Sequence, residues 1–382
     1  MSLSRRSLLS LIAAAPAARA ARSATAYWVY VGANTLKNSK GIYVSKLDAE
    51  SGTFTEPRLA AETLNPLFLK IHPNGRVLYA AIELPGMPGR QGGVGAYSID
   101  PASGKLTFLN REPSRGVQPI YLDVDHSGKT LLVANYGSGS VAALPVRNDG
   151  SLGEITSFIQ HEGSSVNPQR QAGPHAHCAQ ISPNNKFALV PDLGLDKMLI
   201  YRLNSGLAKI EPAEPPFLKL PDGSGPRHVT FHPKKAVAYL ISEMSSTITA
   251  MRWNGSRGWV TEMQTISTLP PDYAGRNFTA EVRAHPGGEF LYGSNRGHNS
   301  ISLFAIQPDG TLRLVENTPT EGQTPNSFTL DPAGRWLVTV NQNSDTVVSF
   351  SINQADGRLK ATGHVMQVDN PAAVRMVAVQ ET

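Results

Sequence analysis

The fold is indicated by a segment that reads Gln118-Pro119-Ile120-Tyr121-Leu122-Asp123-Val124-Asp125-His126-Ser127-Gly128 and continues with Leu131-Leu132-Val133-Ala134-Asn135. It reads as a polar residue and a proline, an apolar strand, a turn that ends in glycine, and a second apolar strand. The same pattern returns along the chain at intervals of roughly 45 to 57 residues, which is the range of propeller blades. The other copies begin at Asn65-Pro66, His175-Ala176-His177, Gly225-Pro226, Ala280-Glu281, Thr324-Pro325 and Asn370-Pro371.

Each copy also has a back half in which alternating strands are joined by Asp-Gly or Ser-Gly turns, as at Asp309-Gly310. Such turns are typical of β-hairpins, so four short strands make one blade. The strands after Tyr27 lack an inner partner, and the C-terminal copy from Ala373 to Val379 lacks outer ones. Joined, the two ends make a seventh blade and leave no open sheet edge. The sequence therefore predicts an all-β fold, a seven-bladed β-propeller over residues 27–382, closed by N-terminal outer strands and a C-terminal inner strand. A β-solenoid or an open sandwich is the alternative.

Residues 1–26 do not fit the repeat and have the features of a twin-arginine signal peptide. Ser4-Arg5-Arg6-Ser7-Leu8-Leu9 opens a short apolar run, and Ala18-Arg19-Ala20 and Ala24-Thr25-Ala26 are candidate cleavage sites. The apolar run is too short to span a bilayer. We expect export through the twin-arginine route to a periplasmic or extracellular location.

Composition excludes several classes of function. The 382-residue chain has a net charge of +5, and a cut after Ala20 would remove Arg5, Arg6 and Arg19 and leave +2. No basic cluster typical of a nucleic-acid or membrane patch remains, and the sequence has no Walker loop, dinucleotide fingerprint or Gly-x-Ser-x-Gly elbow. We expect a small-molecule partner, no nucleic acid and no membrane span. The sequence predicts no particular oligomeric state, and a monomer suffices to close the ring.

A ring of polar side chains is predicted at the mouth of the central channel. It lies eleven residues after the first turn residue of each of six copies, and consists of Glu83, Tyr136, Leu193, Glu243, Arg296 and Gln342. Because the register is the same in every copy, these side chains should surround the channel. The position before them is often Asn or Asp, which we interpret as local support for the strand end.

The inner strands carry a sharper signal. His175 and His177 share one face of a predicted strand, because side chains alternate along a strand. Arg227-His228 and Glu281-Val282-Arg283 fall at equivalent places in the next two copies. This set suits a polar pocket for an anionic ligand that bears a carbonyl group.

Structural interpretations stand beside these functional ones. Arg227 with Glu243, and Glu281 with Arg283, are also expected as ion pairs that tie neighbouring strands together. A metal site that adds Cys178 to the two histidines is disfavoured, because Cys178 points to the opposite strand face. Cys178 is the single cysteine, so no internal disulfide forms. We expect a purely structural role for the turn histidines, namely His72, His232 and His285.

At these residues the sequence resembles the lactonase family of seven-bladed β-propellers, which includes bacterial propeller-type 6-phosphogluconolactonases and fungal carboxy-muconate lactonising enzymes. The resemblance runs from about Tyr27 to Val379. Its most specific pieces are Gly173-Pro174-His175-Ala176-His177, Gly225-Pro226-Arg227-His228 with Glu243, and Ala280-Glu281-Val282-Arg283 through Ser294-Asn295-Arg296-Gly297. Ser242 departs from the family pattern, in which we expect Asn before the Glu. The resemblance implies a site without cofactor or metal.

The resemblance also implies hydrolysis of a sugar-acid lactone, with an unphosphorylated substrate if the protein is exported. Hydrolysis needs an activated water, a partner for the oxyanion and an acid for the leaving alkoxide. We assign Glu243 or a neutral histidine as the base, Arg227 as the oxyanion partner and His177 as the acid. The predicted substrate-binding residues are His175, His228, Glu281, Arg283 and Arg296. A muconate-type cycloisomerase and a non-enzymatic binding platform are the alternatives. The platform predicts an exposed apolar patch and no open pocket.

Overall fold

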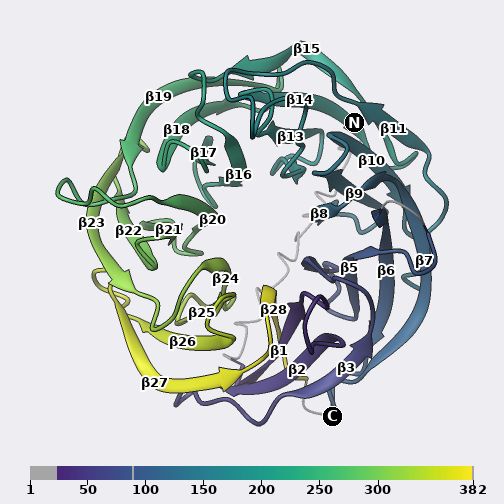
Figure 1. Ribbon diagram of the computed structural model, residues 1–382, viewed down its shortest axis with the longest axis vertical. Coiled ribbons are helices and arrows are strands. Elements are labelled where there is room, and N and C mark those ends of the chain that lie inside the picture. The colour runs from purple at the N-terminus through teal and green to yellow at the C-terminus, as the bar shows by residue number, and fades with distance from the viewer. Residues whose placement is uncertain (1–23, 88–89, 381–382) are drawn as a thin grey trace, which may run out of the picture.

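Seven four-stranded antiparallel sheets form a ring around a central channel in the computed structural model, which describes residues 24–87 and 90–380 (Figure 1). No α-helix occurs in these residues. Strands that follow one another in the chain are neighbours within each sheet, as expected for blades built from hairpins. The predicted all-β, seven-bladed β-propeller is confirmed.

Each blade contributes one strand to each of four layers. The inner strands, which line the channel, are β4 (Phe68–Ile71), β8 (Pro119–Val124), β12 (Gln180–Ile181), β16 (Pro226–Phe231), β20 (Phe278–Ala284), β24 (Pro325–Leu330) and β28 (Pro371–Ala378). The second strands are β5 (Val77–Glu83), β9 (Thr130–Asn135), β13 (Phe187–Asp192), β17 (Val237–Ser242), β21 (Phe290–Arg296), β25 (Trp336–Asn341) and β1 (Ala26–Ala33). The third strands are β6 (Gln91–Ile99), β10 (Ser140–Pro145), β14 (Lys197–Asn204), β18 (Thr247–Asn254), β22 (Ser300–Ile306), β26 (Thr346–Ile352) and β2 (Gly41–Asp48). The outer strands are β7 (Leu106–Val117), β11 (Ser157–Gln160), β15 (Lys209–Lys219), β19 (Trp259–Ser267), β23 (Leu312–Pro319), β27 (Leu359–Gln367) and β3 (Arg58–Glu62).

One sheet joins the two ends of the chain in the order β28-β1-β2-β3. β1 pairs with β28 along its length, so the yellow end of the chain lies beside the purple one (Figure 1). This is the predicted closure. Ala24 and Thr25 also bind the ring, since Arg335 donates to the carbonyl of Ala24 and the amide of Ala49 donates to that of Thr25. A cut after Ala26 would remove these contacts, whereas a cut after Ala20 would leave them intact.

The rest of the predicted leader, residues 1–23, lies outside the described part of the chain. Within the described part, no helix is long and apolar enough to cross a bilayer.

Repeated side-chain bonds hold neighbouring blades together. The predicted structural role of the turn histidines is confirmed, because each places Nε2 within 3.0 Å of a glycine carbonyl in the next blade, in the pairs His72–Gly128, His232–Gly288 and His285–Gly334. Tyrosines of the second strands donate to the next blade in the same way, in the pairs Tyr30–Gly104, Tyr79–Gly150, Tyr239–Gly310 and Tyr292–Gly357. Each such bond stabilises the closed ring by about 1 kcal/mol.

Several inner strands carry a β-bulge close to their first residue. The pairing register shifts by one around Ile120 in β8, Arg227 in β16 and Asn326 in β24, and between Ala373 and Pro371 in β28. A bulge leaves one residue outside the ladder and turns its side chain away from the regular alternation. In this ring the bulges lie at one rim of the channel, so they determine which side chains reach its mouth.

Candidate active site

A cavity of about 240 Å³ opens at this rim and receives side chains from all seven blades. Two sets of positions supply most of its wall. The bulge positions contribute Ile120, Arg227, Asn326 and Ala372, and the strand ends that follow the second strands contribute Asn34, Tyr136, Glu243, Arg296 and Gln342. Arg170, His177 and His228 complete its charged and ionisable side. The open cavity speaks against the binding-platform alternative, which predicts no pocket.

The predicted polar ring is therefore largely at the cavity. Two of its members do not line it, namely Glu83 and Leu193. Glu83 instead forms a 2.6 Å ion pair with the exposed Arg90. Asn34 is the equivalent residue of the blade that joins the chain ends, since its amide donates to Asn370 as that of Glu243 donates to Gly225. Sequence reasoning missed Asn34 because that blade is split between the two ends.

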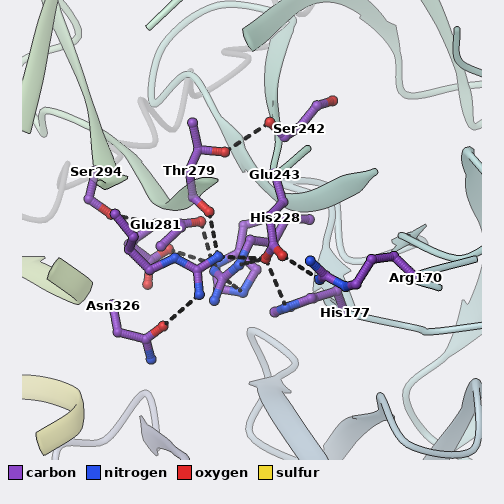
Figure 2. Close-up of polar contacts among 12 residues, drawn as sticks. Arg170, His177, His228, Ser242, Glu243, Thr279, Glu281, Ser294 and Asn326 are labelled. Carbon is purple, nitrogen blue, oxygen red and sulfur yellow. Dashed lines mark hydrogen bonds and ion pairs between the residues drawn. The ribbon is translucent and has the colours of Figure 1, made fainter. Parts of the chain in front are cut away.

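Glu243 lies among three arginines in the cavity wall. Its carboxylate accepts hydrogen bonds from Arg170 and Arg296, each at 2.6 Å, and from Nε of Arg227 at 3.1 Å. Figure 2 shows Arg170 and His177 reaching it from one side. Burial opposes the ionisation of Glu243, but the three arginines outweigh it and lower the pKa to about 2. A carboxylate this acidic is a weak base, so the predicted role of Glu243 as general base does not fit its surroundings.

Arg227 extends from the β16 bulge and is almost fully buried. Besides Glu243 it binds the carbonyl of Ala280, with Nη1 at 2.7 Å. Ala280 lies near the start of the neighbouring inner strand, β20. Burial and the charge of Arg296 lower the pKa of Arg227 to about 10, so it stays cationic at neutral pH. The hydrogen bonds of the described residues leave its Nη2 without an acceptor.

His177 lies beside this arginine cluster and is buried. Nε2 is 4.0 Å from Oε2 of Glu243, while Nδ1 has no hydrogen-bond partner among the described residues. Burial and the charge of Arg227 hold the pKa of His177 well below its usual range, so the ring is neutral. A proton on Nε2 faces the carboxylate, which favours that tautomer.

His228 forms a dyad with Glu281. Nδ1 lies 3.1 Å from Oε1 of Glu281. Although burial opposes ionisation of Glu281, Arg283 and His228 hold the pKa of this carboxyl well below its usual range, so Nδ1 of His228 donates to a carboxylate. Burial and Arg227 lower the pKa of His228 to about 4, against the opposing effect of Glu281.

The position of Arg227 over His228 leaves the second ring nitrogen available. Nη1 of Arg227 lies 3.2 Å from Nε2 and 3.4 Å from Nδ1. Such similar distances place the guanidinium over the ring rather than in its plane. Nε2 of His228 thus keeps its in-plane lone pair.

Glu281 and Arg283, predicted to bind substrate, do not line the cavity. They form an ion pair at 3.2 Å, and Nε of Arg283 donates to the carbonyl of Phe328. Both residues belong to β20, which carries a bulge between Thr279 and Val282, and Arg227 bonds to the carbonyl of Ala280 within this bulge. Glu281 acts on the cavity through His228.

His175 is also outside the cavity wall. The segment around it is not a regular strand, since β12 begins only at Gln180 and a single bridge pairs Ala176 with Asp192. The two histidines nevertheless flank the bridged Ala176 and both pack against Tyr136, so they lie on the same side of this segment. His175 stacks on Tyr136, with ring centroids 4.5 Å apart, and Nδ1 lies 2.9 Å from the carbonyl of Tyr136.

Arg170 is a cavity residue that sequence reasoning missed. It lies in the segment between β11 and β12, which has no counterpart in the repeat. The segment is held by Asp196, which accepts from the hydroxyl of Ser165 at 2.6 Å and from the amide of Gly225 at 2.7 Å. Asp196 thereby ties the Arg170 segment to the turn that precedes Arg227.

The cavity wall has a clear electrostatic character. It contains three arginines and one glutamate, and both histidines are neutral, so its net charge is +2. In the described part of the chain, no cluster of three or more His, Cys, Asp or Glu side chains is arranged to hold a metal ion. The wall thus combines fixed cations with neutral imidazoles, an arrangement suited to a ligand that carries or develops negative charge.

Fold and cavity together define a β-propeller with an enzyme-like site at its channel mouth. Residues 28–376 match the family model for the seven-bladed β-propeller lactonases. The chain is 36% identical over 354 residues to a 6-phosphogluconolactonase of Bacillus subtilis, with 92% of this chain and 99% of that protein covered. It is 31% identical to a 6-phosphogluconolactonase of Formosa agariphila, covering 91% of this chain and 99% of the relative.

A solved structure agrees with these relatives. A periplasmic gluconolactonase of Pseudomonas aeruginosa superposes with a TM-score of 0.87 at 34% identity, covering 93% of this chain and 100% of that one. The chain belongs to the family of seven-bladed β-propeller lactonases.

Proposed function

We propose that this protein hydrolyses the ring ester of a sugar-acid lactone, a gluconolactone or a close analogue. The observation that carries the proposal is the pairing, in one cavity, of a buried arginine that has a free Nη2 with two neutral histidines. The names of the relatives in Bacillus subtilis and Pseudomonas aeruginosa support the same activity.

Arg227 is the oxyanion partner in this proposal. When water attacks the lactone carbonyl, a C–O bond forms and negative charge develops on the carbonyl oxygen. Nη2 of Arg227 is the donor that would receive this oxygen. A fixed cation in a site that excludes water stabilises such charge by several kcal/mol.

His228 is the general base, with Glu281 holding its proton on Nδ1 and leaving Nε2 free to take a proton from water. A pKa of about 4 is low for a general base in the enzyme before reaction, and the charge of Arg227 is part of the cause of this low value. Oxyanion formation on Arg227 offsets that charge, so His228 becomes more basic as the reaction proceeds. The ring C–O bond then breaks, and the proton on His228 passes to the leaving alkoxide.

His177 and Glu243 orient the reactants. The 4.0 Å between Nε2 of His177 and Oε2 of Glu243 is wide enough for one oxygen atom that bonds to both. Nε2 of His177 would donate to the leaving oxygen at this position, and that oxygen would donate to Glu243 once the proton from His228 has made it a hydroxyl. Glu243 keeps the three arginines converging on the cavity, and Arg296 and Arg170 face the polar substituents of the substrate.

We also propose that residues 1–26 contain a twin-arginine leader and that the mature protein works in the periplasm. The leader motif and the periplasmic gluconolactonase of Pseudomonas aeruginosa support this location. The test is cell fractionation of the wild-type chain and of a variant with Arg5→Lys and Arg6→Lys. Export of both to the same extent would contradict the route.

The activity test is turnover of a lactone panel by the purified chain. The panel contains δ-gluconolactone, its 6-phosphate and a muconolactone, with spontaneous hydrolysis subtracted and Arg227→Ala as the inactive reference. We expect hydrolysis of a gluconolactone that falls at least about 100-fold in Arg227→Ala. Conversion of the muconolactone alone would favour a cycloisomerase, and no turnover of any member would refute the proposal.

A further inference from the structure

The ends of the second strands are held by the segment that enters from the preceding blade. Near the end of β21, Asn295 donates from Nδ2 to the carbonyl of Thr268 and accepts from its hydroxyl at 2.7 Å. At the end of β25, Asn341 donates to the carbonyl of Thr320 at 2.9 Å. A neutral pair of asparagine and threonine is therefore sufficient to close this joint in two blades.

The blade of β12 to β15 closes the same joint with ionisable side chains. His161 takes the place of the threonine, because its amide donates to the carbonyl of the residue before a third strand, Gly139, as the amides of both threonines do. Asp192 takes the place of the asparagine, at the end of β13. Nδ1 of His161 lies 2.6 Å from Oδ2 of Asp192, and both side chains are buried.

Tyr201 completes a chain of three buried groups, the Tyr201–His161–Asp192 triad. Its hydroxyl lies 2.9 Å from Nε2 of His161. Phe304 and Phe350 occupy the place of Tyr201 in the two blades with the neutral pair. Burial, aided by Asp192, raises the pKa of Tyr201, so the hydroxyl keeps its proton and donates a hydrogen bond to Nε2. His161 in turn donates from Nδ1, which fixes the orientation of the Asp192 carboxylate.

The other oxygen of Asp192 holds the segment that carries His177. Oδ1 accepts from the amide of His175 at 2.7 Å. Ala176 forms a bridge with Asp192, and the amide of His177 donates to the carbonyl of Pro191 at 2.9 Å. Because β12 begins only after this segment, these bonds take the place of a regular strand pairing around His177.

In three other blades the amide equivalent to that of His175 is bound by a side chain of the preceding blade. The pairs are Gly225–Asp196, Thr324–Asn299 and Asn370–Asp345. At His175 the corresponding residue is Gly139, and a β-carbon there would lie 2.4 Å from the carbonyl oxygen of Pro174. Since the preceding blade has no room for a side chain at this position, Asp192 supplies the acceptor from its own blade.

We propose that Asp192 is a positioning residue for His177, and that His161 and Tyr201 hold Asp192 in the orientation this requires. The three residues do not line the cavity, so they act on the reaction through the segment that they hold. A shift of this segment would change the 4.0 Å separation between His177 and Glu243 that receives the leaving oxygen. The inference rests on the proposed lactonase function for the task of His177, but the anchoring of its segment can be measured without turnover.

The first test is the kinetics of two variants, Asp192→Asn and the double variant His161→Thr with Asp192→Asn. The single variant is nearly isosteric and the double variant recreates the neutral pair of two other blades, so both should fold. Asparagine has one acceptor oxygen, which serves either the residue at position 161 or the amide of His175, but not both. With a gluconolactone, kcat should fall about 10- to 100-fold while KM changes less than about threefold, because His177 acts on the leaving oxygen.

A double-mutant cycle with His177→Ala separates positioning from a general loss of stability. Asp192→Asn should lower kcat about 10-fold or more in the wild-type background and no further in His177→Ala. Asn341→Ala, which removes the equivalent side chain of another blade, is the matched control and should leave kcat unchanged. An equal loss in both backgrounds, or no loss in the wild-type background, would overturn the proposal.

The second test needs no turnover. Hydrogen exchange followed by mass spectrometry reports how firmly the amides of residues 173–178 are held. Both Asp192 variants should exchange at least about 10-fold faster in this segment, whereas Asn341→Ala should match wild type there. Unchanged exchange in the Asp192 variants would overturn the anchoring. A wild type that hydrolyses no lactone would refute the proposed function instead, and this measurement would still decide whether Asp192 holds the segment.

Discussion

Replacing Glu243 by Gln removes the charge around which three arginines are arranged. The pKa of this carboxyl falls from the ordinary 4.5 to about 2 in the folded protein. At about 1.4 kcal/mol per tenfold change in acidity, the folded state gains about 3 kcal/mol at pH 7 from the ionised carboxylate. Because the folded pKa is depressed, this stabilisation is complete above pH 4.5 and is lost as the pH falls toward 2. At pH 3.5 about 2 kcal/mol should remain.

The assay is equilibrium urea unfolding of wild type and Glu243→Gln at pH 7 and pH 3.5. Glu83→Gln is the matched control, since Glu83 holds the same register in another blade but pairs with a single exposed arginine. We expect Glu83→Gln to cost less than about 1 kcal/mol, as is usual for surface ion pairs. A Glu243→Gln variant as stable as wild type, or a deficit that does not shrink at low pH, would refute the picture of a clamped carboxylate.

Three further predictions test the dyad, the blade contacts and the loop anchor. With His228 as base, kcat/KM should rise with pH through about 4. Glu281→Gln removes the charge that raises the pKa of His228, so it should move this rise in the pH–rate profile to lower pH. A rise at the same pH in both proteins would contradict the assignment. His285→Ala loses the bond to the carbonyl of Gly334, so it should lower the free energy of unfolding by about 1 to 2 kcal/mol without changing kcat/KM. A loss of activity at unchanged stability would instead place His285 in the active site. Asp196→Ala should release the Arg170 segment and raise KM at least about threefold in steady-state kinetics, with kcat less affected. An unchanged KM would mean that the segment is held without Asp196.

The fold could be predicted because the repeat specifies it seven times. Similar turns, most of them with proline or glycine, and the same alternation recur from copy to copy, so an error in one copy does not change the count. The closure by β28 and β1 followed from the missing halves at the two ends, and the turn histidines were correctly interpreted as structural. Repetition also located the polar ring, including Glu243 and Arg296, since a shared register puts equivalent side chains at one rim.

The site could be predicted only as far as the repeat extends. His177, Arg227, His228, Glu243 and Arg296 line the cavity, whereas His175, Glu281 and Arg283 do not. Strand alternation misplaced Glu281 and Arg283 because β20 carries a bulge, and His175 lies in an irregular segment before β12. Neither feature has a reliable mark in one sequence. Arg170 was beyond reach because its loop belongs to one blade alone.

The arrangement has a consequence for how precisely this site can be held. The oxyanion partner, the base and the orienting carboxylate lie on one blade, but Glu281, Ala280 and Arg296 come from the next, and His177 and Arg170 from the one before. The distances that matter are therefore set by the packing between blades, which no single hairpin controls. A closed ring fixes those distances because no blade can shift without straining both neighbours. The bonds that tie blade to blade, from the turn histidines to Asp196, thus stabilise the fold and define the geometry of the cavity at the same time.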